Sequence, residues 1–161
     1  ADRTRRDILR RSSIGMMLTN RSESNTVPGA SNFAYGGDAS FSFFQNISLG
    51  GYYSVSNTDG KTDDNQSYQG RFDYAADRYG LQVQFLDVGE NYNPEVGFVR
   101  RYGFDRTYAS ARFSPRPRKR FKGIRQFTYQ ASLEYIQNSA GQLETRNQTG
   151  RFAVERMVPG F

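Results

Sequence analysis

The sequence contains no cysteine and no histidine. Without cysteine there can be no disulfide framework, and no thiol is available for catalysis or for a cysteine-based metal site. The absence of histidine removes the commonest general base and the commonest ligand of transition metals. The composition therefore predicts a protein that is not an enzyme and that holds no metal and no cofactor.

Long apolar runs are missing as well. Hydrophobic residues make up 36% of the chain, and the mean hydropathy is −0.78. No stretch approaches the roughly 18 consecutive apolar residues of a transmembrane helix. The 13 Phe and 11 Tyr nevertheless make the chain rich in aromatics. A transmembrane β-barrel stays compatible with this composition, because its strands carry apolar residues only at every second position.

The formal net charge of +6 is the feature that would suit a nucleic-acid partner. The basic residues are dispersed, however, apart from clusters at 3–11 and 116–122. Binding of single-stranded nucleic acid would need aromatic rings displayed beside the charge, and here the aromatics are used in strand-like segments. We expect no nucleic-acid partner, and we expect the 116–122 cluster to be solvated or to contact anionic lipid head groups.

The clearest pattern in the chain lies between Ile124 and Gln137. One side would carry Phe127, Tyr129, Ala131, Leu133 and Tyr135, and the other Gln126, Thr128, Gln130, Ser132 and Glu134. Side chains alternate with period two in a β-strand, whereas a helix would scatter these residues around its axis. The stretch predicts a strand with one apolar and one polar face. It exceeds the roughly 9–11 tilted residues that cross a bilayer.

Seven further segments are expected to be strands: 12–20, 32–44, 47–56, 67–76, 79–88, 104–114 and 142–155. Residues 1–11 are expected to form a basic lead-in. The connections after the second and fourth strands are short, and those after the first, third and fifth are long. The long connector 115–123 and the short connection 138–141 depart from this alternation.

Short turns at one end and long loops at the other are typical of up-and-down outer-membrane barrels. The sequence therefore predicts an all-β, antiparallel, up-and-down transmembrane β-barrel. The N-terminus lacks the apolar core of a signal peptide, so we expect either that a signal was removed or that the chain is a portion of something longer. The alternative is a soluble lipocalin-like barrel that binds an apolar ligand, for which shorter strands and inward apolar residues are expected.

Seven polar residues fall on the non-aromatic side of the predicted strands: Asp38, Arg71, Asp73, Gln82, Gln84, Gln130 and Glu134. In a barrel they would line the lumen. They could line a pore or ligand site, or they could form an electrostatic network that fills the interior. The mixture of signs favours the network, because buried charges need partners.

The long loop 89–103 carries a second candidate set: Asn91, Tyr92, Asn93, Glu95, Arg100 and Arg101. This mixture could contact a sugar or a partner protein. It could equally belong to a loop that folds into the barrel mouth and is held by Arg–Glu pairs. The sequence does not decide between the two.

Two further patterns are weaker. The acidic loop 58–65 offers oxygen ligands for calcium, but its spacing lacks the bidentate glutamate of an EF-hand, so a solvated loop is expected. Asp73 and Glu134 could serve as the two carboxylates of a glycoside hydrolase only if the fold brought them to a defined separation. Nothing in the sequence places them together.

Several segments resemble one bacterial family: residues 5–21, 32–53 (NFAYGGDASFSFFQNISLGGYY), 92–101 (YNPEVGFVRR), 113–118 (FSPRPR) and 124–146. Its members are large exported proteins with an N-terminal module like family-9 carbohydrate-binding domains and a C-terminal outer-membrane β-barrel of unassigned function. The resemblance implies a barrel of more than eight strands, so we expect residues 1–161 to be a single incomplete domain, an eight-strand section of that larger barrel.

These observations lead to one expected function. We expect a section of a bacterial outer-membrane β-barrel that acts as a membrane anchor, a conduit or a subunit of an envelope complex, linked to the handling of surface glycans. Its expected partners are outer-membrane lipid, other envelope proteins and glycan.

Overall fold

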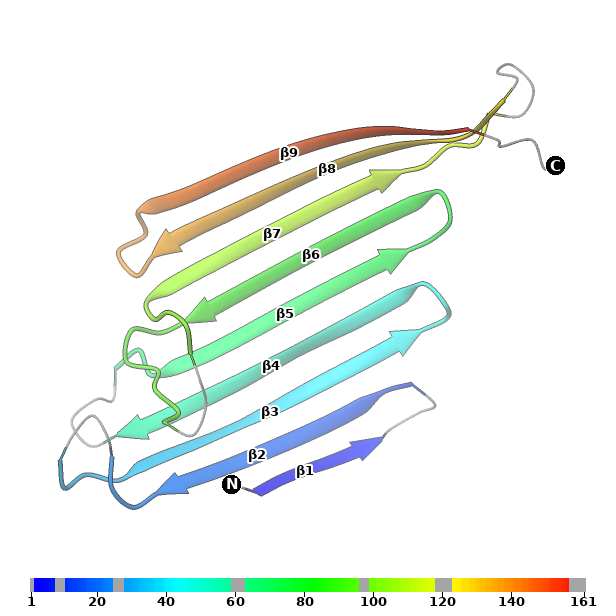
Figure 1. Ribbon diagram of the computed structural model, residues 1–161. Helices are drawn as coiled ribbons and strands as arrows, with labels where there is room; N and C mark the ends of the chain where they lie inside the picture. Colours follow the sequence, from blue (N-terminus) through cyan, green and yellow to red (C-terminus); the bar gives the residue numbers. More distant parts are fainter. Residues whose placement is uncertain are drawn as a thin grey trace.

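The computed structural model describes residues 2–7, 11–24, 28–58, 63–95, 99–117 and 123–156. Their strands form one antiparallel sheet in which each strand pairs with its neighbours in sequence (Figure 1). The strands are β1 (Asp2–Asp7), β2 (Ser13–Arg21), β3 (Asn32–Phe43), β4 (Ile47–Thr58), β5 (Gln66–Ala75), β6 (Tyr79–Val88), β7 (Phe104–Phe113), β8 (Ile124–Asn138) and β9 (Leu143–Arg156). In the described ranges, no helix is long and apolar enough to cross a membrane.

The predicted all-β, antiparallel, up-and-down arrangement is confirmed. Strands β2 to β9 correspond to the eight strands expected from alternation, with ends that differ by at most two residues. Residues 1–11 were expected to form a basic lead-in, but Asp2–Asp7 form the strand β1. This strand pairs with β2, from Asp2 opposite Leu18 to Asp7 opposite Ser13. Its sequence, DRTRRD, contains no apolar residue, so the periodicity of apolar residues could not reveal this strand.

The sheet is open. Among the strands of the described ranges, β1 pairs only with β2 and β9 only with β8, so the sheet is not closed into a barrel. Each outer strand therefore presents a row of unpaired backbone N–H and C=O groups, which is a template for another strand.

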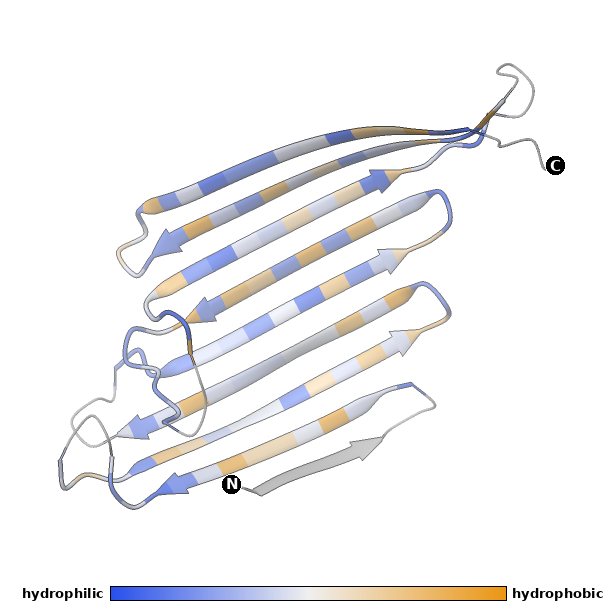
Figure 2. Cartoon of the chain, in the orientation of Figure 1, coloured by the Kyte–Doolittle hydropathy of each residue, from blue (hydrophilic) through white to orange (hydrophobic). Residues whose placement is uncertain are grey.

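The strand register separates the side chains into two chemically different faces. One face, which we call the apolar face, carries among others Tyr35, Leu49, Phe72, Val83 and Leu133. The opposite, polar face carries among others Asp38, Arg71, Gln84, Ser132 and Glu134. Hydrophobic and hydrophilic residues accordingly alternate along most strands (Figure 2).

Aromatic residues of the apolar face form two rows that cross the strands. The turn-end row runs over β6 to β9, with ring centroids 5.2 Å apart for Tyr79–Phe113, 6.3 Å for Phe113–Tyr129 and 5.0 Å for Tyr129–Phe152. The loop-end row consists of Tyr53, Tyr68 and Phe85 on β4 to β6 and of Tyr135 on β8, with Thr107 of β7 between Phe85 and Tyr135. Tyr79 and Phe85 are separated by about 20 Å of strand, and Leu81 and Val83 lie between them on the same face.

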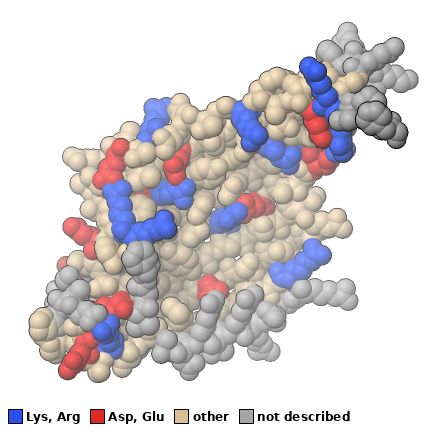
Figure 3. Space-filling model, viewed as in Figure 1, with Lys and Arg blue, Asp and Glu red and all other residues tan. Residues whose placement is uncertain are grey.

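The polar face is the more crowded of the two. On β6, Leu81, Val83 and Phe85 are exposed although they are apolar, whereas Gln82 and Gln84 are only partly exposed. The described parts of the loop between β6 and β7, residues 89–95 and 99–103, lie in front of this face at the loop end of the sheet (Figure 1), and from here on 'the loop 89–103' means these parts. Basic and acidic side chains are seen beside one another on the same side of the molecule (Figure 3).

The described residues contain little hydrophobic core. The buried apolar residues are Ala30, Ala34, Val55, Val88 and Tyr92, while the fully buried side chains belong to Asn32, Ser56, Ser67 and Ser114. Large side chains of the apolar face, such as Met16 at 63% and Phe152 at 58% exposure, remain uncovered. The sheet is therefore held mainly by its backbone ladder, and its apolar face is left without a cover in this part of the chain.

Two glycines that face each other across β4 and β5 provide a test of the strand packing. A Cβ added to Gly51 would lie 2.4 Å from the carbonyl oxygen of Gln69, whereas nothing lies within 4 Å of a Cβ added to Gly70. We expect Gly51→Ala to lower the free energy of unfolding by about 1–3 kcal/mol, and Gly70→Ala to leave it unchanged or raise it by up to about 1 kcal/mol. A denaturant titration measures both. Equal effects would contradict the packing described here.

Candidate functional site

The loop 89–103 folds onto the polar face and creates the most structured site of the described chain. The phenol of Tyr92 donates a hydrogen bond to Ser54 Oγ at 3.0 Å, and the backbone N–H of Asn93 donates to Ser56 Oγ at 2.8 Å. Both serines lie on β4, on the polar face. Their small side chains let the loop backbone approach the sheet closely, so the loop lies against the strands.

Asn32 at the start of β3 anchors the same loop from a fully buried position. Its Nδ2 donates to the carbonyl oxygen of Asn93 and to Thr58 Oγ1, both at 2.8 Å. Buried amide groups are costly unless they are hydrogen-bonded. The contact therefore stabilises one conformation of the loop.

Glu95 holds the loop at its far side. Its side chain is 2% exposed, it accepts a hydrogen bond from Ser24 Oγ, and its Oε2 lies 3.9 Å from Arg21 Nε. The backbone of Glu95 has a φ of 41°, a left-handed conformation that is uncommon for residues other than glycine. The buried carboxylate and its partners offset that conformational cost, which explains how the loop keeps this turn.

A second loop supports the base of the first. The backbone N–H of Asn91 donates to the carbonyl oxygen of Asp64 at 3.0 Å, and the N–H of Glu90 donates to Asp64 Oδ2 at 2.7 Å. At the other end, Gly103 accepts a hydrogen bond from the N–H of Ser139 at 3.1 Å. The connection after β6 therefore contacts both the connection after β4 and the connection after β8 at the loop end of the sheet.

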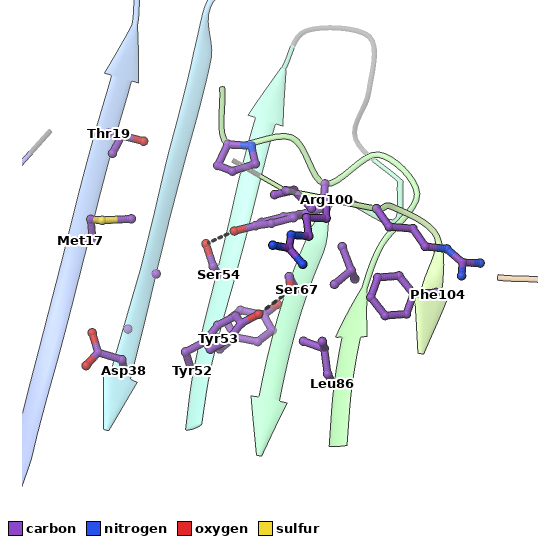
Figure 4. Close-up of a pocket in the computed structure, with 17 residues that line it drawn as sticks. Met17, Thr19, Asp38, Tyr52, Tyr53, Ser54, Ser67, Leu86, Arg100 and Phe104 are labelled. Carbon is purple, nitrogen blue, oxygen red and sulfur yellow. Dashed lines mark hydrogen bonds between the residues drawn. The ribbon is translucent and has the colours of Figure 1, made fainter. Parts of the chain in front are cut away.

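Between the loop and the polar face lies a cleft of about 890 Å³, which we call the loop cleft. The apolar residues that line it include Met17, Leu86, Val88, Val99 and Phe104. Figure 4 shows Met17, Leu86 and Phe104 around it together with polar residues of β3 to β5. Leu86 and Val88 reach this face because the alternation of β6 places Asp87, and not an apolar residue, on the apolar face near its end.

Two arginines of the loop differ sharply in their surroundings. Arg101 pairs with Glu144 and lies over the ring of Phe104, with its guanidinium carbon 5.2 Å from the ring centroid. Arg100 lines the cleft, and within the described part of the chain its side chain has no hydrogen bond or ion pair (Figure 4). Among the described residues that line the cleft, Arg100 is thus a solvent-exposed guanidinium without a carboxylate partner.

The wall of the cleft opposite the loop carries hydroxyl groups whose hydrogen atoms already donate hydrogen bonds within the protein. Ser67 Oγ donates to the carbonyl oxygen of Asp87 at 2.8 Å, so in the 3.1 Å contact between Tyr52 and Ser67 the phenol must be the donor. The phenol hydrogen of Tyr92 is likewise donated to Ser54 Oγ (Figure 4). Both phenol oxygens can therefore offer only lone pairs to a bound molecule.

The seven residues predicted for the polar side of the strands all lie on the polar face: Asp38, Arg71, Asp73, Gln82, Gln84, Gln130 and Glu134. Arg71 and Asp73 pair at 2.5 Å, and Glu134 pairs with Arg106 at 2.6 Å and accepts from Asn147 Nδ2 at 3.0 Å. These are local ion pairs between charges of opposite sign. Arg106 was missed from the sequence, because the alternation of its strand is irregular.

The structure does not bring Asp73 and Glu134 together. They lie on β5 and β8, three strand spacings apart, which is about 14 Å, and each carboxylate has its own arginine partner. The two carboxylates of a glycosidase are about 5–9.5 Å apart. This pair therefore lacks the geometry of a hydrolytic site.

The six loop residues singled out from the sequence divide into two groups. Tyr92, Asn93 and Glu95 bind the loop to the sheet, as described above, and Asn91 Nδ2 donates to the backbone oxygen of Asp63 at 2.7 Å. Arg100 and Arg101 line the cleft. The cleft residues Met17, Tyr52, Leu86 and Val88 were not predicted from the sequence. The end of β6 nevertheless carried a signal, because Leu86 and Val88 fall on the polar side of the strand and Asp87 on the apolar side.

The remaining candidates are only partly described. Residues 59–62 of the acidic loop and residues 118–122 of the basic connector lie outside the described residues. Across the ranges that are described, no three acidic side chains gather as they would to hold a metal ion. Arg116, at the edge of the connector, pairs with Asp77 at 2.6 Å.

Comparison with protein families, with curated proteins and with solved structures finds no significant match.

The buried phenol of Tyr92 gives the loop a predicted dependence on pH. Burial raises the pKa of Tyr92, while its hydrogen bond to Ser54 opposes this rise. A raised pKa in the folded state stabilises the fold below the unfolded value of about 10, and that stabilisation is lost as the pH rises through the folded value. At neutral pH we expect Tyr92→Phe to lower the free energy of unfolding by about 1 kcal/mol.

Above about pH 10 the stabilities of the wild type and of Tyr92→Phe should converge. The measurement is a series of denaturant titrations across this range, with Tyr79→Phe as the control because Tyr79 is 55% exposed. A gap between wild type and Tyr92→Phe that stayed constant at alkaline pH would contradict the assignment.

Proposed function

We propose that this chain is part of a bacterial outer-membrane β-barrel, with the apolar face toward lipid and the polar face toward an aqueous interior. In this role it anchors a surface protein or forms part of a conduit. The observation that carries the proposal is the pair of aromatic rows on the apolar face, with Leu81, Val83, Ala131 and Leu133 between them. An apolar band between two aromatic girdles is the usual outer surface of such barrels.

The dimensions of the strands support the same function. β6 has 10 residues and β8 has 15, and roughly 9–11 tilted residues suffice to cross a bilayer. Most large side chains of the apolar face are exposed. Covering a Leu or Phe side chain with an apolar surrounding is favourable by roughly 1.5–3 kcal/mol, so lipid would provide the cover that the described chain does not.

The soluble lipocalin-like alternative is less well supported. Such a barrel holds its apolar ligand in an interior lined by apolar side chains. Here the more crowded face is the polar one, and it carries the ion pairs Arg71–Asp73 and Arg106–Glu134. A lipocalin-like barrel would instead need the aromatic rows on its inside and these charges on its outside.

The wider role remains part of the proposal. The two open edges would be completed by further strands, in keeping with the resemblance to larger barrels of exported bacterial proteins. On this view the loop 89–103 narrows the interior in the manner of a partial plug. Envelope proteins and surface glycan are the partners that this location implies.

Substitution of arginine on the two faces of β8 tests the proposal. Leu133→Arg should lower the free energy of unfolding in phospholipid vesicles by roughly 2–4 kcal/mol, because the charge would lie near the middle of the bilayer. Ser132→Arg should be nearly neutral, since its cross-strand neighbours Ser110 and Thr149 are uncharged. Gln130 is a poorer control position, because it lies between Arg112 and Arg151.

A protein that meets water on both faces would behave differently. Leu133 is 40% exposed, and an exposed surface substitution usually changes stability by no more than about 0.5 kcal/mol. Equal small changes in the free energy of unfolding at the two positions, or a larger loss for Ser132→Arg, would contradict the membrane assignment.

A further inference from the structure

The loop cleft differs from the rest of the polar face in having an apolar lining. Met17, Leu86, Val88 and Phe104 all lie on this otherwise polar face, and Val99 closes the cleft from the loop side. Its volume of about 890 Å³ falls within the roughly 300–1,000 Å³ that is typical of small-molecule sites. Apolar walls and a few placed polar groups are the usual composition of such sites.

Arg100 supplies the charge of this site. Its guanidinium points from the loop toward the hydroxyl groups of Tyr52 and Ser67 on the sheet (Figure 4). Among the described residues, no carboxylate pairs with it. A guanidinium can bind a carboxylate with two parallel hydrogen bonds, which are among the strongest in proteins. An unpaired arginine beside apolar walls is therefore suited to an anion that has an apolar body.

The nearby acidic residues do not compensate Arg100. Glu95 is engaged with Ser24 and Arg21, and Glu144 with Arg101. Asp38 lies at the opposite end of the cleft and has an interaction of its own (Figure 4). Its negative charge would disfavour an anion at that end. The charge distribution therefore fixes the orientation of a bound anion, with its charged end toward Arg100.

The neutral donors of the cleft do not compete with Arg100. The phenol hydrogens of Tyr52 and Tyr92 are directed at Ser67 and Ser54, so neither is available to a carboxylate. The phenol rings remain as flat surfaces against which an aromatic or aliphatic body can pack. Discrimination between an acid and its neutral amide would thus depend chiefly on one residue.

The geometry points to the loop cleft as a binding site for small organic monocarboxylates, with the carboxylate on Arg100 and the apolar body between Leu86, Val88 and the rings of Tyr52 and Tyr92. This inference rests on the proposed function and deepens it, because it names the class of solute that the interior of the barrel would meet. Binding itself needs only the loop and the strands β2 to β7 in their described arrangement.

The test is calorimetric titration of the intact protein in phospholipid vesicles with phenylacetate and with its neutral counterpart, phenylacetamide. We expect saturable binding of phenylacetate and binding of phenylacetamide that is weaker by about tenfold or more. Arg100→Gln should remove this preference and leave the affinity for the amide unchanged. Arg151→Gln is the matched control, since Arg151 is exposed on β9, on the same face and outside the cleft.

A second readout locates the ligand. Phenylacetate should slow hydrogen exchange at the backbone N–H groups of Asn91, Tyr92 and Asn93, which donate to Asp64 of the neighbouring loop, to Gly89 of the same loop and to Ser56 of β4, respectively. Equal affinity for acid and amide, equal losses in Arg100→Gln and Arg151→Gln, or no saturable binding would each overturn the inference. The Leu133→Arg and Ser132→Arg substitutions test membrane insertion independently. Loss of phenylacetate binding in a protein that passes that test contradicts the binding site and leaves the proposed function standing.

Discussion

The alternation of side chains across a paired antiparallel sheet constrains every other feature of this protein. Once the nine strands pair in sequence order, each residue is assigned to a face by its position, and a shift of one residue in register would exchange the faces. The backbone ladder therefore converts a chain of low mean hydropathy into a sheet with one apolar surface and one polar surface. Its stability as an isolated sheet is limited, because few apolar side chains are buried.

This constraint accounts for the two unusual parts of the structure. The turn-end aromatic row arises because the strand register places four residues opposite one another on neighbouring strands, although they are far apart in sequence. These residues are Tyr79, Phe113, Tyr129 and Phe152. The loop 89–103 lies on the polar face because that face offers serine hydroxyls and a buried asparagine as partners for its backbone. A hydrophobic surface could not have satisfied those groups. The same polar groups that distinguish this face from the apolar face therefore hold the loop there.

Much of the fold could be predicted from the sequence, because alternation is a local signal. The strands β6 and β8 were recognisable from Leu81, Val83 and Phe85 and from Phe127 to Tyr135, and the loop 89–103 was located correctly. β1 could not be found, since its residues carry no apolar pattern. The pairing of Glu134 with Arg106 and the cleft beneath the loop depend on which strands are neighbours and on where the loop folds. Those are long-range facts that no single stretch of residues contains.

The central claim is that the apolar face meets hydrocarbon and the polar face meets water. The absence of cysteine allows a single reactive site to be introduced at any position. Val83→Cys and Gln84→Cys are adjacent in the middle of β6 but lie on opposite faces. After labelling with an environment-sensitive fluorophore in vesicles, the label at position 83 should be quenched by brominated lipid, and the label at position 84 by aqueous iodide. Equal or reversed quenching would contradict the account.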